Sequence, residues 1–222
     1  EHGKGGIRPC QHVGGRRPHL LGLRVGGTGE VHHAAIAFRD QVVAGHVGAR
    51  ALQDGRIQDQ LHVLSAGANR WLHDHPRTAD RLLVASSLAV DGVTLFVLGY
   101  GLLGPSFAPF WGLLALFAAR QACQAVVALP APPGIIWRDP GVPSLFVTYT
   151  VGNDFFFSGH TALAVFGAMQ LAGLGLPAVT ALGVLIAVLQ MILVILLRAH
   201  WTLDVLAGLF AALAAGLLFP PG

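Results

Sequence analysis

One short stretch of the chain combines a helix-capping residue with a histidine. Ser158, Gly159 and His160 follow one another directly before a long apolar run. Ser158 is a good helix N-cap, and the free backbone N–H groups of the first helical turn can bind an anion. The stretch therefore predicts an anion-binding position beside the His160 ring.

A second stretch carries a histidine and a carboxylate at helical spacing. Arg198 and His200 precede the last apolar run, and Asp204 follows His200 by four residues. Residues four apart share one face of a helix, so Asp204 can hold one ring nitrogen of His200 and leave the other for attack. This pattern is typical of an activated histidine nucleophile.

Long apolar runs must position both stretches. Five runs each approach the roughly 17–25 residues that a helix needs to cross a membrane; they cover 82–104, 108–129, 160–176, 178–197 and 202–219. The third and fourth runs separate His160 from His200, so two crossings return the chain to the same membrane face. The sequence predicts an all-α multi-span transmembrane bundle of about five spans with both histidines at one end.

The composition agrees with a membrane protein. The chain is 54% hydrophobic and only 11% charged, and its mean hydropathy is +0.62, whereas soluble domains carry about a quarter charged residues. The net charge of +3 comes from basic residues scattered through a Gly- and His-rich N-terminal part. Because they form no helical stripe and few aromatics accompany them, we expect no nucleic-acid partner.

The N-terminal quarter differs from the rest of the chain. Residues 1–56 show no lasting helical or strand period, which predicts a disordered or non-native segment. Between 57 and 83, apolar residues recur at helical spacing until Pro76, which predicts an interfacial amphipathic helix with Trp71 at headgroup level. The predicted membrane domain is therefore 57–222.

Further candidate residues lie in the second apolar run and in the long loop 130–158. Arg120 lies inside an apolar span, where a cation needs an anion; that anion is either a substrate phosphate or Asp91. Arg138 is either a phosphate ligand or an interfacial residue. Asp154 either belongs to the site or caps the next helix.

These motifs resemble a known superfamily. Phe157–His160 and His200–Gly208 resemble the second and third signature motifs of the type-2 phosphatidic acid phosphatase superfamily. Arg120 with Leu129–Pro132, and the stretch Asn153–Thr161, resemble its sphingomyelin-synthase-like branch more closely. The resemblance covers about 61–219. It implies that His200 is the nucleophile on phosphorus, Asp204 its orienting partner and His160 the acid for the leaving oxygen.

The superfamily also has a lysine–arginine motif and an arginine six residues before the second histidine. This chain has no Lys after Lys4, and Val194 occupies the latter position. Arg120, Arg138 or Arg198 must therefore supply the phosphate-binding cation.

The resemblance predicts a lipid phosphate phosphatase that acts on a phospholipid or lipid phosphate in the bilayer. The alternatives are a sphingomyelin-synthase-like headgroup transferase and a non-catalytic lipid-binding or transport relative. A zinc site of two His and one carboxylate is a further alternative, but neither histidine is followed by the Glu of zinc proteases. We expect no metal and no cofactor, in a multi-pass protein of the plasma membrane.

Overall fold

The computed structural model describes residues 52–53, 56–147, 149 and 156–221. The chain divides into two units, Glu1–Ile57 and Gln58–Gly222. The described part of the first unit is an antiparallel pair of two-residue strands, β1 (Leu52–Gln53) and β2 (Arg56–Ile57). The prediction for segment 1–56 falls almost entirely outside the described residues.

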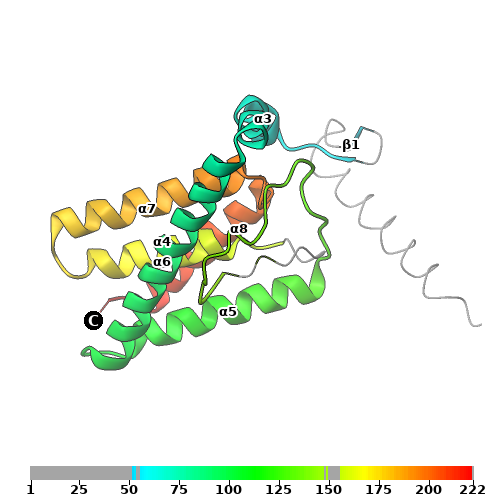
Figure 1. Ribbon diagram of the computed structural model, residues 1–222. Helices are drawn as coiled ribbons and strands as arrows, with labels where there is room; N and C mark the ends of the chain where they lie inside the picture. Colours follow the sequence, from blue (N-terminus) through cyan, green and yellow to red (C-terminus); the bar gives the residue numbers. More distant parts are fainter. Residues whose placement is uncertain (1–51, 54–55, 148, 150–155, 222) are drawn as a thin grey trace, which may run out of the picture. The chain divides into compact units, whose positions relative to one another are not determined.

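The described part of the second unit is helical, which confirms the predicted all-α class for this unit (Figure 1). Its helices are α2 (Gln60–Leu64), α3 (Ala66–Asp74), α4 (Pro76–Leu103), α5 (Ala108–Val126), α6 (Gly159–Ala172), α7 (Pro177–Leu196) and α8 (Thr202–Leu218).

Proline and glycine set several of these boundaries. Pro76 and Pro177 are the first residues of α4 and α7, where a missing N–H costs nothing. Gly175 has a φ of +68°, a left-handed turn that ends the segment after α6. The prediction of a single amphipathic helix within 57–83 is wrong. Ser65 separates two helices there, α2 and α3, and α4 starts at Pro76.

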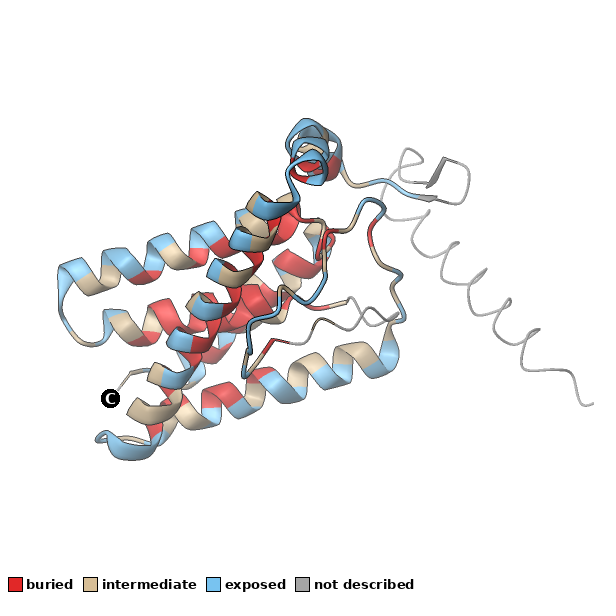
Figure 2. Ribbon diagram, viewed as in Figure 1, coloured by how far each residue is buried: buried red, intermediate tan, exposed pale blue. Residues whose placement is uncertain are grey.

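Helix α6 lies at the centre of the unit and contacts α4, α5, α7 and α8. Figure 2 shows it buried along most of its length, while the outer helices expose one face. Glycines on α6 and on its neighbours allow this close packing. A Cβ on Gly112 of α5 would collide with the Phe166 ring, and one on Gly167 of α6 would collide with Val93 of α4. The fold thus holds the His160-bearing helix from all sides.

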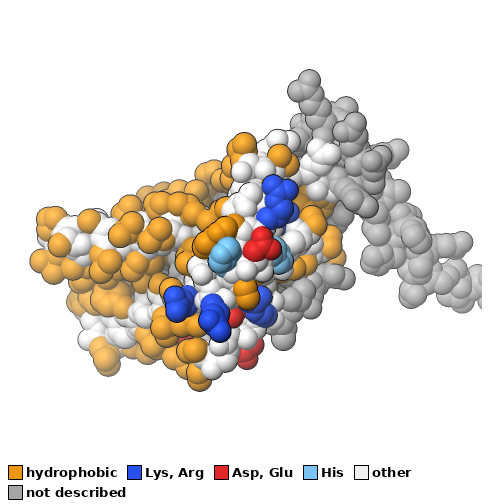
Figure 3. All heavy atoms as spheres, turned by 45° about the horizontal axis from the view of Figure 1, so that its top comes forward, with side chains coloured by type: hydrophobic (Ala, Val, Ile, Leu, Met, Phe, Trp, Pro, Cys, Tyr) orange, Lys and Arg blue, Asp and Glu red, His pale blue; other side chains and the backbone are white. Residues whose placement is uncertain are grey.

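Large apolar side chains cover the outer faces of the long helices (Figure 3). Charged and histidine side chains gather together on the face that Figure 3 shows. Among the described residues, two helices are long and apolar enough to cross a membrane, α4 and α7, with mean hydropathies of 2.0 and 2.8. Helix α8 is apolar but shorter. These helices support membrane association.

Candidate active site

His200 lies in the link between α7 and α8. Arg198 has a φ of +53°, so the chain turns sharply in a left-handed conformation just before the histidine. The His200 side chain is mostly buried, and its Nδ1 lies 3.7 Å from Oδ2 of the fully buried Asp204. The same Oδ2 accepts the Trp201 N–H at 2.9 Å. The predicted His200–Asp204 pair is therefore present at 3.7 Å, but the predicted shared helical face is wrong, because His200 lies in the link before α8 and only Asp204 lies on the helix.

His160 lies in the first turn of α6. The N-cap Ser158 accepts the Thr161 N–H at 3.4 Å and contacts the Thr161 hydroxyl at 3.0 Å, as its predicted role requires. The His160 ring is buried and meets the Trp137 ring edge to face, with centroids 5.2 Å apart. Within the described part of the chain its Nε2 has no hydrogen-bond partner. A buried, unsatisfied ring nitrogen indicates a position prepared for a further group.

The starts of α6 and α8 are joined directly. The Ser158 N–H donates to the Asp204 carbonyl at 3.0 Å. Gly208 permits this approach, because a Cβ there would lie 2.5 Å from the Ser158 carbonyl oxygen. The structure thus brings His160, His200 and Asp204 to one end of the helical unit.

Arg120 of α5 lies against the start of α6. A Cβ on Gly159 would be 3.6 Å from the Arg120 Nε and 3.7 Å from its Cδ. Neither a hydrogen bond nor an ion pair of Arg120 occurs among the described residues. Gly159 therefore lets the Arg120 side chain lie close to the start of α6, where the two residues line a small cavity of about 20 Å³.

Asp91, the alternative partner of Arg120, is used elsewhere. Its carboxylate accepts hydrogen bonds from the Ser144 hydroxyl and from the Leu145 and Phe146 N–H groups, at 2.9 to 3.0 Å. It therefore fixes the long loop against α4 instead of neutralising Arg120.

The other two predicted arginines are engaged with protein oxygens. Arg198 donates to the Pro133 carbonyl at 2.7 Å and to the His62 carbonyl at 2.9 Å. Arg138 pairs with Asp80 at 2.7 Å, and both side chains are exposed. Asp154 lies outside the described residues.

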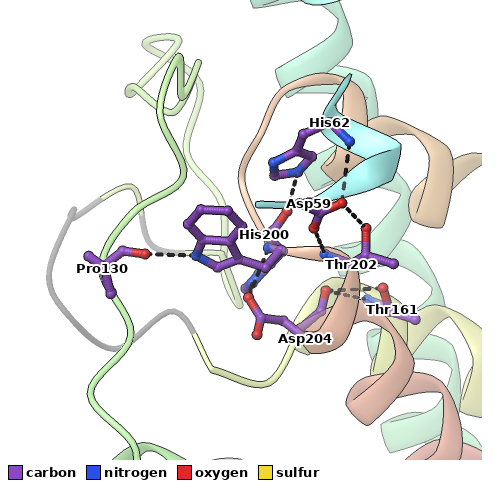
Figure 4. A network of polar contacts seen from close by, with 9 residues as sticks. Asp59, His62, Pro130, Thr161, His200, Thr202 and Asp204 are labelled. Atoms are coloured by element: carbon purple, nitrogen blue, oxygen red, sulfur yellow. Dashed lines mark hydrogen bonds and ion pairs between the residues drawn. The ribbon is translucent and has the colours of Figure 1, made fainter. Parts of the chain in front are cut away.

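Two residues near His200 were not among the predicted site residues (Figure 4). Asp59 accepts the Thr202 N–H and the Thr202 hydroxyl, both at 2.6 Å. The His62 Nε2 lies 3.1 Å from the His200 carbonyl oxygen. The N-cap pattern of Asp59 before α2 is readable from the sequence, but its contact with α8 spans 143 positions and has no local signal.

Burial and hydrogen bonding shift the titration of both residues. Burial raises the pKa of Asp59, but the hydrogen bonds from the Thr202 hydroxyl and N–H outweigh it and lower the pKa below 3.8. Burial lowers the pKa of His62 below 6.5, more than the nearby Asp59 charge raises it. At neutral pH the structure therefore holds an ionised Asp59 next to a neutral His62.

The long loop lines a pocket of about 680 Å³ between Asp139 and Tyr149. The Tyr149 ring contacts Trp137 with centroids 5.0 Å apart, and Trp137 in turn contacts His160. The Tyr149 hydroxyl is hydrogen-bonded to Ser87 of α4. Burial raises the pKa of Tyr149 above its ordinary value, so this hydroxyl is neutral. Tyr149 and Trp137 thus form a chain of ring contacts between the pocket and His160.

Neither the curated proteins nor the solved structures contain a match to this chain. A family model, described as AtPDCT1/2, matches residues 59–219. The matched range begins at Asp59 and includes Arg120, His160, His200 and Asp204. It covers most of the chain and agrees with the sphingomyelin-synthase-like resemblance. The chain therefore belongs to the AtPDCT1/2 family, the phosphatidylcholine:diacylglycerol cholinephosphotransferases, which are sphingomyelin-synthase-like lipid phosphotransferases.

Proposed function

We propose that this protein transfers the phosphocholine headgroup of phosphatidylcholine to the hydroxyl of a diacylglycerol, through a covalent intermediate on His200. The observation that carries the proposal is the meeting of the His200–Asp204 pair with His160 at the joined starts of two helices. The family favours this transferase, the alternative in the sequence interpretation, over a phosphatase.

The reaction would take place in two displacements. With Nδ1 facing Asp204, the Nε2 of His200 attacks phosphorus, and the bond from phosphorus to the glycerol oxygen breaks. His160 gives its proton to the leaving oxygen, which releases diacylglycerol. A second diacylglycerol hydroxyl then attacks phosphorus and returns a proton to His160, while the phosphorus–nitrogen bond breaks.

The phosphate would bind at the start of α6. The first N–H groups of a helix have no acceptor within the helix and favour an anion, and Arg120 lies beside Gly159. At the start of α8, by contrast, Asp204 and Asp59 already accept the Trp201 and Thr202 N–H groups. Arg120 is therefore the preferred phosphate ligand, and Arg198 and Arg138 hold the protein framework.

The trimethylammonium end of the headgroup would enter the loop pocket. Aromatic faces attract quaternary ammonium groups. Trp137 contacts His160 on one side and Tyr149 on the other, and Tyr149 lines the pocket. Asp139 lines the pocket, and no Lys, Arg or His is among its described lining residues. The Asp91 carboxylate binds Ser144, which also lines the pocket. The charge at this position suits a cation.

The membrane position follows from the outer surfaces. We propose that α4, α5, α6, α7 and α8 together form a five-span integral membrane bundle, because exposed large apolar side chains are spread over the outer helices. Examples are Leu95, Trp111, Leu185 and Phe210. The plasma-membrane location stays a prediction, which a fluorescent fusion in cells checks.

The test uses purified full-length protein in vesicles that contain phosphatidylcholine labelled in the choline methyl groups and a diacylglycerol with distinguishable acyl chains. Mass spectrometry should find labelled phosphatidylcholine with the new acyl chains. Release of free phosphocholine alone would identify a hydrolase. In a second assay, with vesicles that contain phosphatidic acid, release of inorganic phosphate would support the phosphatase. Absence of all three products in well-folded protein would favour the non-catalytic lipid-binding alternative.

A further inference from the structure

The short helix α2 precedes the apolar helices, yet it contacts the link that carries His200. Its N-cap Asp59 accepts two N–H groups of its own helix, from Leu61 and His62, at 3.0 and 3.3 Å. The same carboxylate accepts both donors of Thr202 at 2.6 Å. One side chain therefore caps the starts of two helices, α2 and α8, that are far apart in sequence.

His62 adds a second connection to the same link. The His200 carbonyl oxygen can only accept, so the Nε2 of His62 carries the proton of this hydrogen bond. The ring of His62 also stacks on Trp201, with centroids 5.4 Å apart. Its own carbonyl accepts a hydrogen bond from Arg198. Figure 4 shows the bonds from His62 to His200 and from Thr202 to Asp59 at the turn before α8.

The first half of the link is held by α7, since the Ala199 N–H donates to the Val194 carbonyl, and its second half is held by two carboxylates. Arg198 bends in the left-handed region, which side chains other than glycine adopt at a cost. Asp204 and Asp59 then accept two consecutive N–H groups, those of Trp201 and Thr202. Fixing both groups determines the path of the backbone directly after His200. A nucleophile must be held within about 0.5 Å of its reacting position for efficient catalysis.

We infer that Asp59 is a positioning residue for His200, with His62 as its helper, and that α2 is thus part of the catalytic apparatus. This inference rests on the proposed function. Because Asp59 acts through the backbone of Thr202 and does not touch substrate, its loss should lower kcat and leave KM nearly unchanged.

The principal variants are Asp59→Ala, Asp59→Asn and Thr202→Val. Asp59→Ala removes both bonds to Thr202 and should lower kcat by roughly 10- to 100-fold, since misplacement of a reacting group by about 1 Å has effects of this size. Asp59→Asn keeps one acceptor and should be intermediate. Thr202→Val removes only the hydroxyl bond and keeps the N–H bond, so it should fold normally and lose roughly 3- to 10-fold in kcat.

Two comparisons separate positioning from general damage. Asp74→Asn makes the same chemical change as Asp59→Asn on an exposed residue of α3 and should leave kcat unaltered. The double variant Asp59→Ala with Thr202→Val should lose no more than Asp59→Ala alone, because both changes remove one shared contact. Additive losses, a change confined to KM, or a kcat of Thr202→Val and Asp59→Asn at the wild-type value would each overturn the inference.

A measurement that needs no turnover distinguishes this inference from the proposed function. The rate at which diethyl pyrocarbonate modifies His200, followed by mass spectrometry of its peptide, should rise in Asp59→Ala and stay constant in Asp74→Asn. If wild-type protein transfers no headgroup, the proposed function fails, but a changed His200 rate still supports the positioning role. If transfer is present and the His200 rate is the same in all variants, the positioning role is wrong.

Discussion

The starts of α6 and α8 lie side by side, and each carries a histidine, but their surroundings have opposite charge. At α6 the capping side chain is the neutral Ser158, and the Arg120 side chain of α5 lies close to Gly159. At α8 the capping groups are two carboxylates, Asp204 from within the helix and Asp59 from α2. The start of α6 is thus suited to bind an anion, whereas carboxylates already occupy N–H groups at the start of α8.

This difference explains how two histidines take different roles. A helix start that keeps free N–H groups beside an arginine can bind the phosphate and stabilise the charge that develops on it. A helix start whose N–H groups are occupied cannot compete for the phosphate, but its carboxylate can orient an imidazole. This contrast supports the proposed roles, in which His160 acts beside the bound phosphate and His200 is the nucleophile.

The largest expected effect tests this division directly. His200→Ala should lower kcat by roughly 10⁴-fold or more and remove the phosphorylated intermediate. His160→Ala should also reduce transfer, but it should recover partly on substrates with a leaving group that needs no proton, such as p-nitrophenyl phosphocholine. Trapping and peptide mapping of the acid-labile intermediate provide the measurement. A phosphorylated intermediate on His160 would mean that His160 is the nucleophile and His200 the acid.

The second effect concerns the cation at the α6 start. Arg120→Gln should lower kcat by roughly 10²- to 10³-fold, as for the loss of one group that stabilises transition-state charge. Arg120→Lys should recover part of this, because it keeps the charge and loses the planar fork. Arg138→Gln is the matched control, since an exposed ion pair contributes at most about 1 kcal/mol. Equal losses of kcat in Arg120→Gln and Arg138→Gln would contradict the proposal that the phosphate binds at the start of α6.

The third effect is a pH dependence of stability at the α8 start. The pKa of His62 is lower in the folded protein than the ordinary 6.5, so the unfolded chain binds the proton more readily as the pH falls. The stability from neutral His62 is complete above pH 6.5 and decreases below it. The contribution of Asp59, whose pKa is below 3.8, is lost only at lower pH. Thermal unfolding in detergent should therefore show a smaller acid slope between pH 7 and 5 for His62→Gln than for wild type.

A smaller effect is expected from removing residues 1–56. These residues precede Asp59, so a chain that starts at Ile57 keeps every contact described at the α8 start. Its kcat should stay within about twofold of the full chain, because the removed residues include none of the proposed site residues. A chain that starts at Ala66 loses Asp59 and His62 and should have the low kcat of Asp59→Ala. Similar activity in both shortened chains would contradict the role of α2.

No effect is expected from chelation. A histidine nucleophile assisted by an arginine needs no Lewis acid at either helix start, unlike a metal-assisted hydrolase. Transfer activity should persist after dialysis against EDTA, measured with the same labelled lipids. Loss of activity that zinc restores would require new roles for both histidines.

Local patterns were sufficient to predict part of this arrangement. The capping residue Ser158, the spacing of His200 and Asp204, and the prolines that begin α4 and α7 are all signals carried by neighbours in the chain. Such signals determine where helices begin and which side chains share a face.

Contacts between distant segments were not predictable in this way. Nothing near Asp59 in the sequence indicates that it binds Thr202, 143 positions later. Arg198 and Arg120 are both arginines close to a motif, and only the fold distinguishes one that binds carbonyl groups from one that lies beside Gly159. The role of Asp91 depends in the same way on where the long loop returns.

The short, enclosed helix α6 has a consequence for the surrounding lipid. Its 14 residues give a length of about 21 Å, against a hydrocarbon core of about 30 Å. Because its neighbours surround it, the shortfall is hidden from the acyl chains and carries little mismatch energy of its own. In the proposed five-span bundle His160 would lie deeper than the headgroups, and the donor lipid would have to sink into the leaflet before its phosphorus reaches the histidine. Turnover should therefore be faster in bilayers of short-chain lipids than in thick ones.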